Sequence, residues 1–175
     1  MKRINVFIKG SYDYKSRIGI WTFYLEWNGA VMKRSGSLRD AQSNVRVTLY
    51  ALIQAIDCIN EPCILDVHTK LNLGFKTIKK SKNADLIRDI QHRIIRAGHL
   101  YNITLDFDDK IIEKWERLYG NKDNQKKIKD EAIKQRDELD KNLDEQRLQN
   151  KSLREMYDEL MSESNDKWIP GMGGY

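Results

Sequence analysis

The dipeptide Asn28-Gly29 constrains the fold of this chain more than any other short feature of the sequence. It joins two runs rich in aromatic and β-branched residues, within GIWTFYLEWNGAVMKRSGSL (19–38). Asn and Gly both tolerate a positive φ, which a two-residue hairpin turn requires. The sequence therefore predicts two antiparallel strands, near 18–27 and 30–37, as the start of a sheet.

Strand and helix patterns alternate around this hairpin. Three further segments have the composition of strands, namely 3–9, 63–69 and 101–108. Apolar residues at three- and four-residue steps predict helices packed on the sheet at 43–56 and 84–98. Ser43 or Asn44 can cap the first helix, and Gly98 can end the second. With a last helical stretch, the order βββαβαβα predicts an α/β fold: a mixed five-stranded sheet with flanking helices.

The last third of the chain has a different character. From about 123 to 164 it contains no Pro or Gly and is dense in charged residues, which predicts a helix of about 60 Å at 1.5 Å per residue. We expect a domain at 1–138, a helical extension at 139–165 continuous with the helix from about 123, and a flexible tail at 166–175. Five apolar residues are candidates for an interaction surface: Leu139, Leu143, Leu153, Tyr157 and Leu160.

Three arrangements of this segment stay open. It can associate with itself or a partner, fold back on the domain as a hairpin, or fray as a tail. Measured through Leu148, the apolar steps are four and five residues, which is irregular for a coiled coil. A protein partner, including a second copy bound through the helix, is the first expectation.

Charge is unevenly distributed along the chain. Residues 1–120 carry 20 Lys and Arg against 13 Asp and Glu, whereas 121–175 carry 11 against 13. A basic N-terminal part fits a polyanionic partner, although excess lysine is also a common means of solubility.

Cysteine and histidine do not form a metal pattern in this sequence. Cys58 and Cys63 match no zinc spacing and are expected as reduced thiols, and the three histidines are scattered. We expect no cofactor and no metal. With no apolar run long enough for a bilayer or a signal peptide, a cytoplasmic or host-cell-interior location without membrane contact is expected.

Four segments, in order, resemble the ribonuclease H family over about residues 1–138. Gly10-Ser11 matches the Gly-Ser after the family's first catalytic Asp, at the end of strand one. SNVRVTLYALIQAI (43–56) is similar to the first-helix signature, and LDVHTKLNLGFKTI (65–78) to the fourth strand and the segment after it. GNKDNQKKIKDEA (120–132) resembles the start of the last helix, Gly-x-x-x-Asn-x-x-x-Asp-x-x-Ala.

The resemblance implies a site that has lost its acids. Enzymes of this family hold two Mg²⁺ ions between four carboxylates, and the metals generate the attacking hydroxide. The corresponding positions here are Lys9, Thr48, Lys70 and Ile128, so the formal charge moves from −4 to +2. Because hard dications need oxygen ligands, preferably anionic, we expect no catalytic residues and no metal-dependent hydrolysis.

Other carboxylates lie near these positions in the sequence. Asp13 follows strand one, Asp66 lies in the fourth strand, and Asp106, Asp108 and Asp109 follow the fifth. A relocated metal centre would need several coincidences. We expect solvated carboxylates, or ion-pair partners for Lys9 and Lys70.

Two functions follow as expectations. One is a catalytically inactive interaction, inhibitor or scaffold module, encoded by a phage or mobile element and directed at a host nucleoprotein complex. The other is metal-independent binding of nucleic acid, without sequence specificity, at the vacated site. Its contact residues would be Lys9, Asn44, Arg46, Lys70, Lys76, Lys79 and Lys80. An enzyme of unrelated mechanism lacks support, because no catalytic triad, phosphate loop or dinucleotide fingerprint is present.

Overall fold

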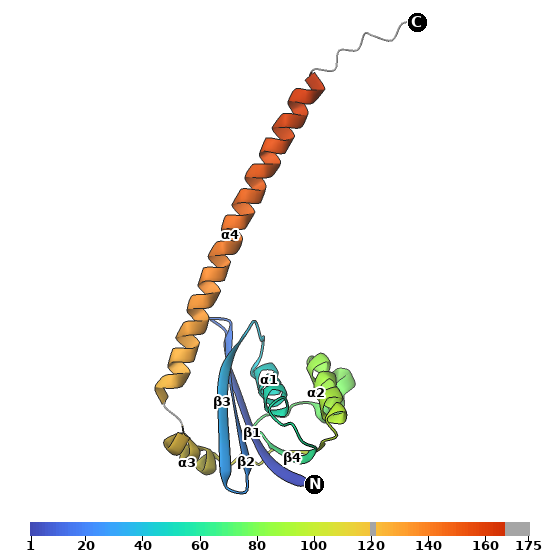
Figure 1. Cartoon of the computed structure of the whole chain (residues 1–175), viewed down its shortest axis with the longest axis vertical. Coiled ribbons are helices and arrows are strands. Elements are labelled where there is room, and N and C mark those ends of the chain that lie inside the picture. Colours follow the sequence, from blue (N-terminus) through green and yellow to red (C-terminus); the bar gives the residue numbers. More distant parts are fainter. Residues whose placement is uncertain (120–121, 167–175) are drawn as a thin grey trace, which may run out of the picture. The chain divides into compact units, whose positions relative to one another are not determined.

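A mixed five-stranded sheet forms the centre of the domain (Figure 1). The computed structural model describes residues 1–119 and 122–166, with side-chain environments for 1–118 and 126–162. The strands are β1 (Lys2–Asp13), β2 (Ile18–Trp27), β3 (Ala30–Arg39), β4 (Cys63–His68) and β5 (Leu100–Thr104). They lie in the order β3-β2-β1-β4-β5, in which β1, β2 and β3 are antiparallel and β1, β4 and β5 are parallel. This sheet, with its flanking helices and a long C-terminal helix, confirms the predicted ribonuclease H-like α/β fold.

The hairpin forms at the position that the sequence predicts. Trp27 pairs with Ala30, and the two residues between them have positive φ, 51° at Asn28 and 82° at Gly29. Two other strand limits were predicted wrongly. β1 continues beyond residue 9 because β2 pairs with it as far as Asp13. β5 ends at Thr104 rather than 108 because its partner strand β4 ends at His68, so later residues have no ladder to join.

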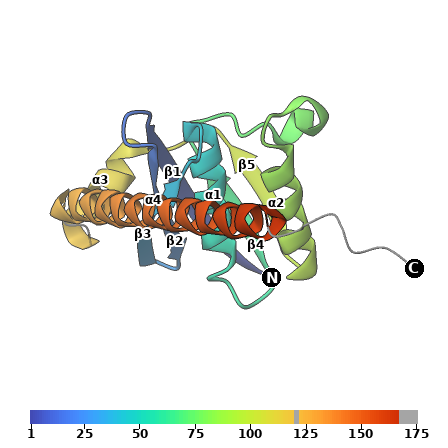
Figure 2. The ribbon, with the colours of Figure 1, turned by 90° about the horizontal axis from the view of Figure 1, so that it is seen from above.

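Two helices cover one face of the sheet. α1 (Asn44–Ile56) and α2 (Ala84–Arg96) lie side by side there (Figure 2). Ser43, not Asn44, caps α1, because its hydroxyl accepts the backbone N–H of Arg46. Gly98 follows α2 with a φ of 69°, as its predicted role as a stop requires. The main apolar core lies between this face and the helices, and includes Val6, Ile8, Phe23, Leu25, Leu49, Leu52, Leu65, Ile87 and Ile90.

The opposite face of the sheet carries a helix that the sequence did not predict, α3 (Asp109–Tyr119). Phe7 and Tyr24 alternate with the core residues along β1 and β2, so their side chains point to this face. Ile112 of α3 is buried against them, and Trp115 packs beside it. A short 3₁₀ segment, η1 (Phe75–Lys80), also lies between β4 and α2 and was not predicted.

The last helix, α4 (Lys122–Asp166), runs without a break for 45 residues. The chain divides into two compact units, Met1–Ile133 and Lys134–Tyr175, so the beginning of α4 belongs to the first unit. None of the helices in the described ranges has the length and apolar character needed to cross a membrane. Residues 167–175 of the predicted tail, and Gly120 of the last-helix motif, lie outside the described residues.

Candidate functional site: paired lysines at the ends of β1 and β4

Lys9 points from β1 to the face that α3 covers. Its Nζ donates to Glu116 Oε1 of α3 at 2.7 Å, and the Tyr24 hydroxyl donates to the same oxygen at 2.8 Å. The side chains of Lys9 and Glu116 are 37% and 26% exposed, and Tyr24 is fully buried. Lys9 is therefore engaged with a carboxylate inside the domain.

The protonation states of this cluster support one another. Burial alone would raise the pKa of Glu116, but the Lys9 ammonium and the Tyr24 hydroxyl outweigh it and lower that pKa. Burial, followed by the nearby Glu116 carboxylate, raises the pKa of Tyr24. Glu116 is thus an anion at neutral pH, and Tyr24 is a neutral donor to it.

Lys70, just after β4, is held by the first residue of the same helix. Its Nζ makes an ion pair with Asp109 and lies 5.2 Å from the centroid of the Phe107 ring. Asp108 accepts the backbone N–H groups of Lys110 and Ile111, as a capping carboxylate does at a helix N-terminus. Both lysines at the strand ends are thus neutralised by carboxylates of α3.

The sequence predicts the ion-pair partner of one lysine and not that of the other. Asp109 pairs with Lys70 as expected, whereas the partner of Lys9 is Glu116, which lies 107 positions away and was not predicted. Asp66 binds Arg3 and Asn102. Thr104 and His68 hold Asp106 and lower its pKa, although its partial burial acts in the opposite direction.

Thr48 occupies a closed position between α1 and β1. It is 1% exposed, and its hydroxyl donates to the Asn44 carbonyl at 2.9 Å. A Cβ on Gly10 would lie 2.5 Å from the Thr48 backbone nitrogen, so strand and helix backbones are in direct contact here. The Asn44 side chain accepts the Tyr12 backbone N–H at 2.6 Å, which ties the end of β1 to the start of α1.

Arg46 is also committed within the domain. Its guanidinium binds both Asp85 oxygens, at 3.1 and 2.6 Å, and thereby joins α1 to α2. This contact lowers the pKa of Asp85 and raises that of Arg46. Of the predicted nucleic-acid contacts, Lys9, Arg46 and Lys70 therefore have internal anionic partners.

At the fourth position, the structure favours Lys129 over Ile128. Ala132 follows Ile128 by four residues, whereas the family pattern has Asp-x-x-Ala, so counting back from Ala132 reaches Lys129. Lys129 Nζ binds Asp13 Oδ2 at 2.7 Å. Lys129, the backbone N–H of Lys15 and the Ser16 hydroxyl together lower the pKa of Asp13 well below its usual value.

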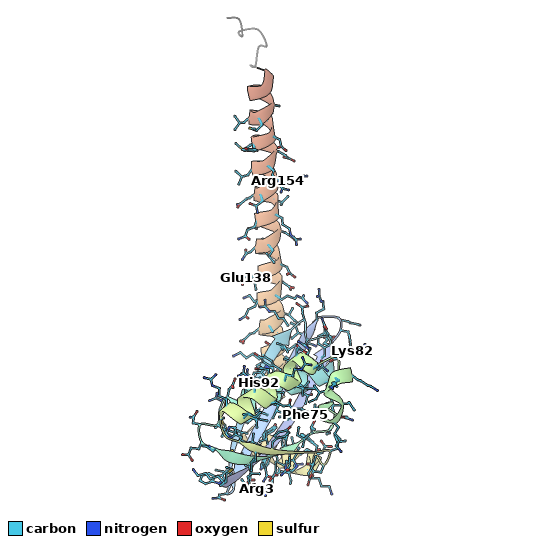
Figure 3. The ribbon with its side chains drawn as sticks, turned by 90° about the vertical axis from the view of Figure 1, so that its right-hand side faces the viewer. Arg3, Phe75, Lys82, His92, Glu138 and Arg154 are labelled. Atoms are coloured by element: carbon cyan, nitrogen blue, oxygen red, sulfur yellow. The ribbon has the colours of Figure 1, made fainter. Side chains whose placement is uncertain are left out.

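The lysines of η1 differ from those at the strand ends. Lys76, Lys79 and Lys80 are exposed, and Lys82 follows them just beyond the segment, with its side chain at the edge of the domain in Figure 3. Within the described residues, none of the four has a hydrogen-bond or ion-pair partner. We name Lys76, Lys79, Lys80 and Lys82 the η1 lysine cluster.

The donor set at the strand ends does not fit a dication. Lys9 and Lys70 offer ammonium groups, and the only oxygen among the positions of the resemblance is the buried Thr48 hydroxyl. Across residues 1–118 and 126–162, no three His, Cys, Asp or Glu side chains are grouped so that they could hold a metal ion.

Comparison with known proteins supports a ribonuclease H-like family. The chain is 36% identical over 72 residues to a ribonuclease H of a Chelativorans species, covering 41% of this chain and 44% of that protein. It is 35% identical over 69 residues to a ribonuclease H of Brucella anthropi and to one of Campylobacter curvus, covering 39% of this chain and 44% and 46% of theirs. The chain thus spans less than half the length of the curated relatives it matches. No family model matches it.

Proposed function

We propose that this chain is a ribonuclease H-like module that does not hydrolyse nucleic acid and acts by binding, as an interaction, inhibitor or scaffold protein directed at a nucleoprotein complex. The observation that carries this proposal is the pairing of Lys9 with Glu116 and of Lys70 with Asp109. At each of these two positions the family's chemistry needs a free carboxylate, and this chain has a lysine that is already paired with a carboxylate of α3.

Electrostatics supports the loss of the metal-dependent route. Two unit charges about 4 Å apart interact by roughly 4 kcal/mol at an effective dielectric of about 20. An ion near Lys9 and Lys70 would meet two ammonium groups and would compete with them for Glu116 and Asp109. No step of two-metal catalysis is therefore assigned to these residues.

The test is cleavage of an RNA–DNA hybrid by the full chain, with Mg²⁺ and with Mn²⁺, beside an active ribonuclease H. We expect no metal-dependent product above the buffer rate. The control is a double variant, Glu116→Gln with Asp109→Asn, purified in the same way. A contaminating nuclease would give the same activity in both preparations, whereas activity of the chain itself would change. Cleavage by the wild-type chain that this variant loses would overturn the proposal.

A second candidate function is nucleic-acid binding, and the η1 lysine cluster favours it. These four lysines carry positive charge that no anion of the described residues neutralises, unlike Lys9 and Lys70. Lysine contacts to phosphate give affinity without sequence readout and release counterions, so the affinity falls with salt. This candidate places the contact surface at η1 rather than at the strand ends.

Binding to hybrid, duplex and single-stranded probes across a salt series tests this candidate. Replacing the η1 lysine cluster by glutamine should weaken binding and reduce the salt slope by about 0.7 to 0.9 for each phosphate that the protein no longer neutralises. The matched control is Lys9→Met with Lys70→Met, which should leave the slope unchanged. If the control variant weakened binding equally, the nucleic-acid contacts would include Lys9 and Lys70 at the strand ends. If the wild-type chain bound no probe at low salt, this candidate function would be excluded.

A further inference from the structure

Apolar side chains on the second unit of the chain are exposed in a regular pattern. Leu139, Leu143, Leu153, Tyr157 and Leu160 of α4 are 48 to 64% exposed. Nothing among the described residues covers them. An apolar stripe exposed along one helix is typical of a surface that packs against another one.

The stripe is a regular heptad seam once two polar residues are included. Gln146 and Asn150 complete the series 139, 143, 146, 150, 153, 157, 160, whose steps alternate four and three. This is the a/d spacing of a coiled coil, with Leu143 at a and Leu139 at d. The spacing measured through Leu148 is irregular because Leu148 falls at position f, on the far side of the helix.

We propose that this seam binds the same seam of a second copy of the chain, in a parallel, in-register, two-stranded coiled coil. The inference rests on the proposed interaction function and specifies the partner that α4 binds. The seam covers about 22 residues, or roughly 33 Å of helix.

The polar residues in the seam favour a parallel pair. Asn150 occupies an a position, where a single asparagine fixes register and oligomer state at some cost in stability. In a parallel dimer each Asn150 side chain meets its own copy, because equivalent residues then share a layer. A shift by one heptad would instead set Asn150 against Leu143 or Tyr157 and leave its amide without a partner.

The flanking residues also favour the parallel arrangement. Parallel pairing sets g residues against e residues five positions later, so Met156 meets Met161 while Arg147 and Arg154 face Asn142 and Gln149. No like charges oppose each other in these pairs. The two methionines, 56 and 48% exposed, widen the apolar seam next to Tyr157 and Leu160.

In an antiparallel pair, the residues that face each other across the seam are less compatible. With Gln146 opposite Asn150, it brings Asp140 towards Arg154, but it also sets Leu160 against Arg136 and Arg147 against Arg147 of the other copy. This register extends the pairing back to Arg136, four residues from Ala132, which is only 4% exposed and belongs to the first unit.

The a and d positions from 139 to 160 hold no charged residue. Lys141 pairs with Glu145, and Lys151 with Glu155, both at 3.9 Å and one helical turn apart. These residues hold positions f, c, b and f, so their pairs support the helix itself and leave the a/d face uncharged. Figure 3 labels Glu138, at position c, and Arg154, at position e, with side chains extending from the helix.

The mass of the full chain in solution, from on the order of 1 to 100 µM by sedimentation equilibrium, tests the inference. We expect a monomer–dimer equilibrium. Leu153→Asp should weaken dimerisation at least tenfold, whereas Leu148→Asp, at an equally exposed leucine outside the seam, should not change it. Circular dichroism of both variants checks that the helix persists.

Orientation needs a separate measurement. In a Cys58→Ser background, Leu153→Cys should form a disulfide between two copies on mild oxidation, because only the parallel arrangement places residue 153 beside itself. Cross-linking only between Leu143→Cys and Leu153→Cys chains would show antiparallel pairing and overturn the inference. So would a monomer at every concentration, a trimer, or equal effects of the two aspartate variants. A monomer would leave the hybrid-cleavage result, and with it the proposed loss of hydrolysis, unaffected.

Discussion

Lys9 and Glu116 join β1 to α3, so a double-mutant cycle of Lys9→Met and Glu116→Gln should reveal their coupling. A hydrogen bond to a charged group contributes about 1.5 to 3 kcal/mol when sheltered. Because the Lys9 side chain is 37% exposed, solvent screening reduces this, and we expect a coupling of about 1 kcal/mol. Lys9→Met alone should cost somewhat more, since it leaves a half-buried Glu116 with only the Tyr24 hydroxyl as donor.

Urea unfolding followed by tryptophan fluorescence suits this measurement. The Trp115 ring lies 5.1 Å from Phe7 and 5.7 Å from Tyr24, so its emission should report the loss of α3 from the sheet. The same chain offers a control in Lys2 and Glu61, an ion pair of similar length with side chains 48% and 67% exposed. The equivalent cycle there should give no measurable coupling.

Two results would contradict the reasoning. A coupling below about 0.3 kcal/mol between Lys9 and Glu116 would place this pair among ordinary surface ion pairs. If Lys9→Met instead stabilised the domain, the cost of removing the Lys9–Glu116 pair from water would exceed the attraction within the pair. The electrostatic part of the proposed function would then fail.

Three further results are expected. The pKa of Glu116 lies below its ordinary value of 4.5. The ionised Glu116 therefore stabilises the folded protein fully above about pH 4.5, and this stabilisation is lost as the pH falls through the lowered pKa. In urea unfolding, the stability advantage of wild type over Glu116→Gln should shrink between about pH 7 and pH 3. Gly10→Ala should destabilise the domain by about 2 to 3 kcal/mol in urea unfolding, because the new Cβ would clash with the backbone of α1. The new Cβ of Gly29→Ala would contact no other atom, so this variant should lose only about 1 kcal/mol through its positive φ. In a thiol titration Cys58 should react first and Cys63 only on unfolding, because burial raises the pKa of the Cys63 thiol; equal rates would contradict that burial.

Local signals in the sequence were sufficient for the sheet and for α1 and α2. The turn at Asn28-Gly29 and the cap at Ser43 depend on neighbours a few positions away, so their chemistry can be read directly. α3 was not predicted because the strand predicted at 101–108 was extended up to Asp109, where α3 begins. Asp108 before Ile111, Ile112 and Trp115 was the signal for a capped amphipathic helix.

The candidate site could be predicted only in part, because its charges are balanced by residues distant in the sequence. Residue types at Lys9 and Lys70 indicated the loss of anions, but whether those ammonium groups are available depends on Glu116 and Asp109. Arg46 was interpreted as a nucleic-acid contact for the same reason, since its partner Asp85 lies on another helix. Composition alone could not separate these lysines from the η1 lysine cluster.

The contact between Lys9 and Glu116 also makes the two positions depend on each other under mutation. An aspartate at position 9 would place a carboxylate, on a shorter side chain, on the face where the Lys9 ammonium now binds the Glu116 carboxylate at 2.7 Å. A single substitution towards metal binding would thus lose an attraction and gain a repulsion before any cation could compensate. If Glu116 changed first instead, Lys9 would lose its anion. Either order of the two changes is expected to pass through a less stable protein, so the pair opposes the introduction of a carboxylate at this strand end.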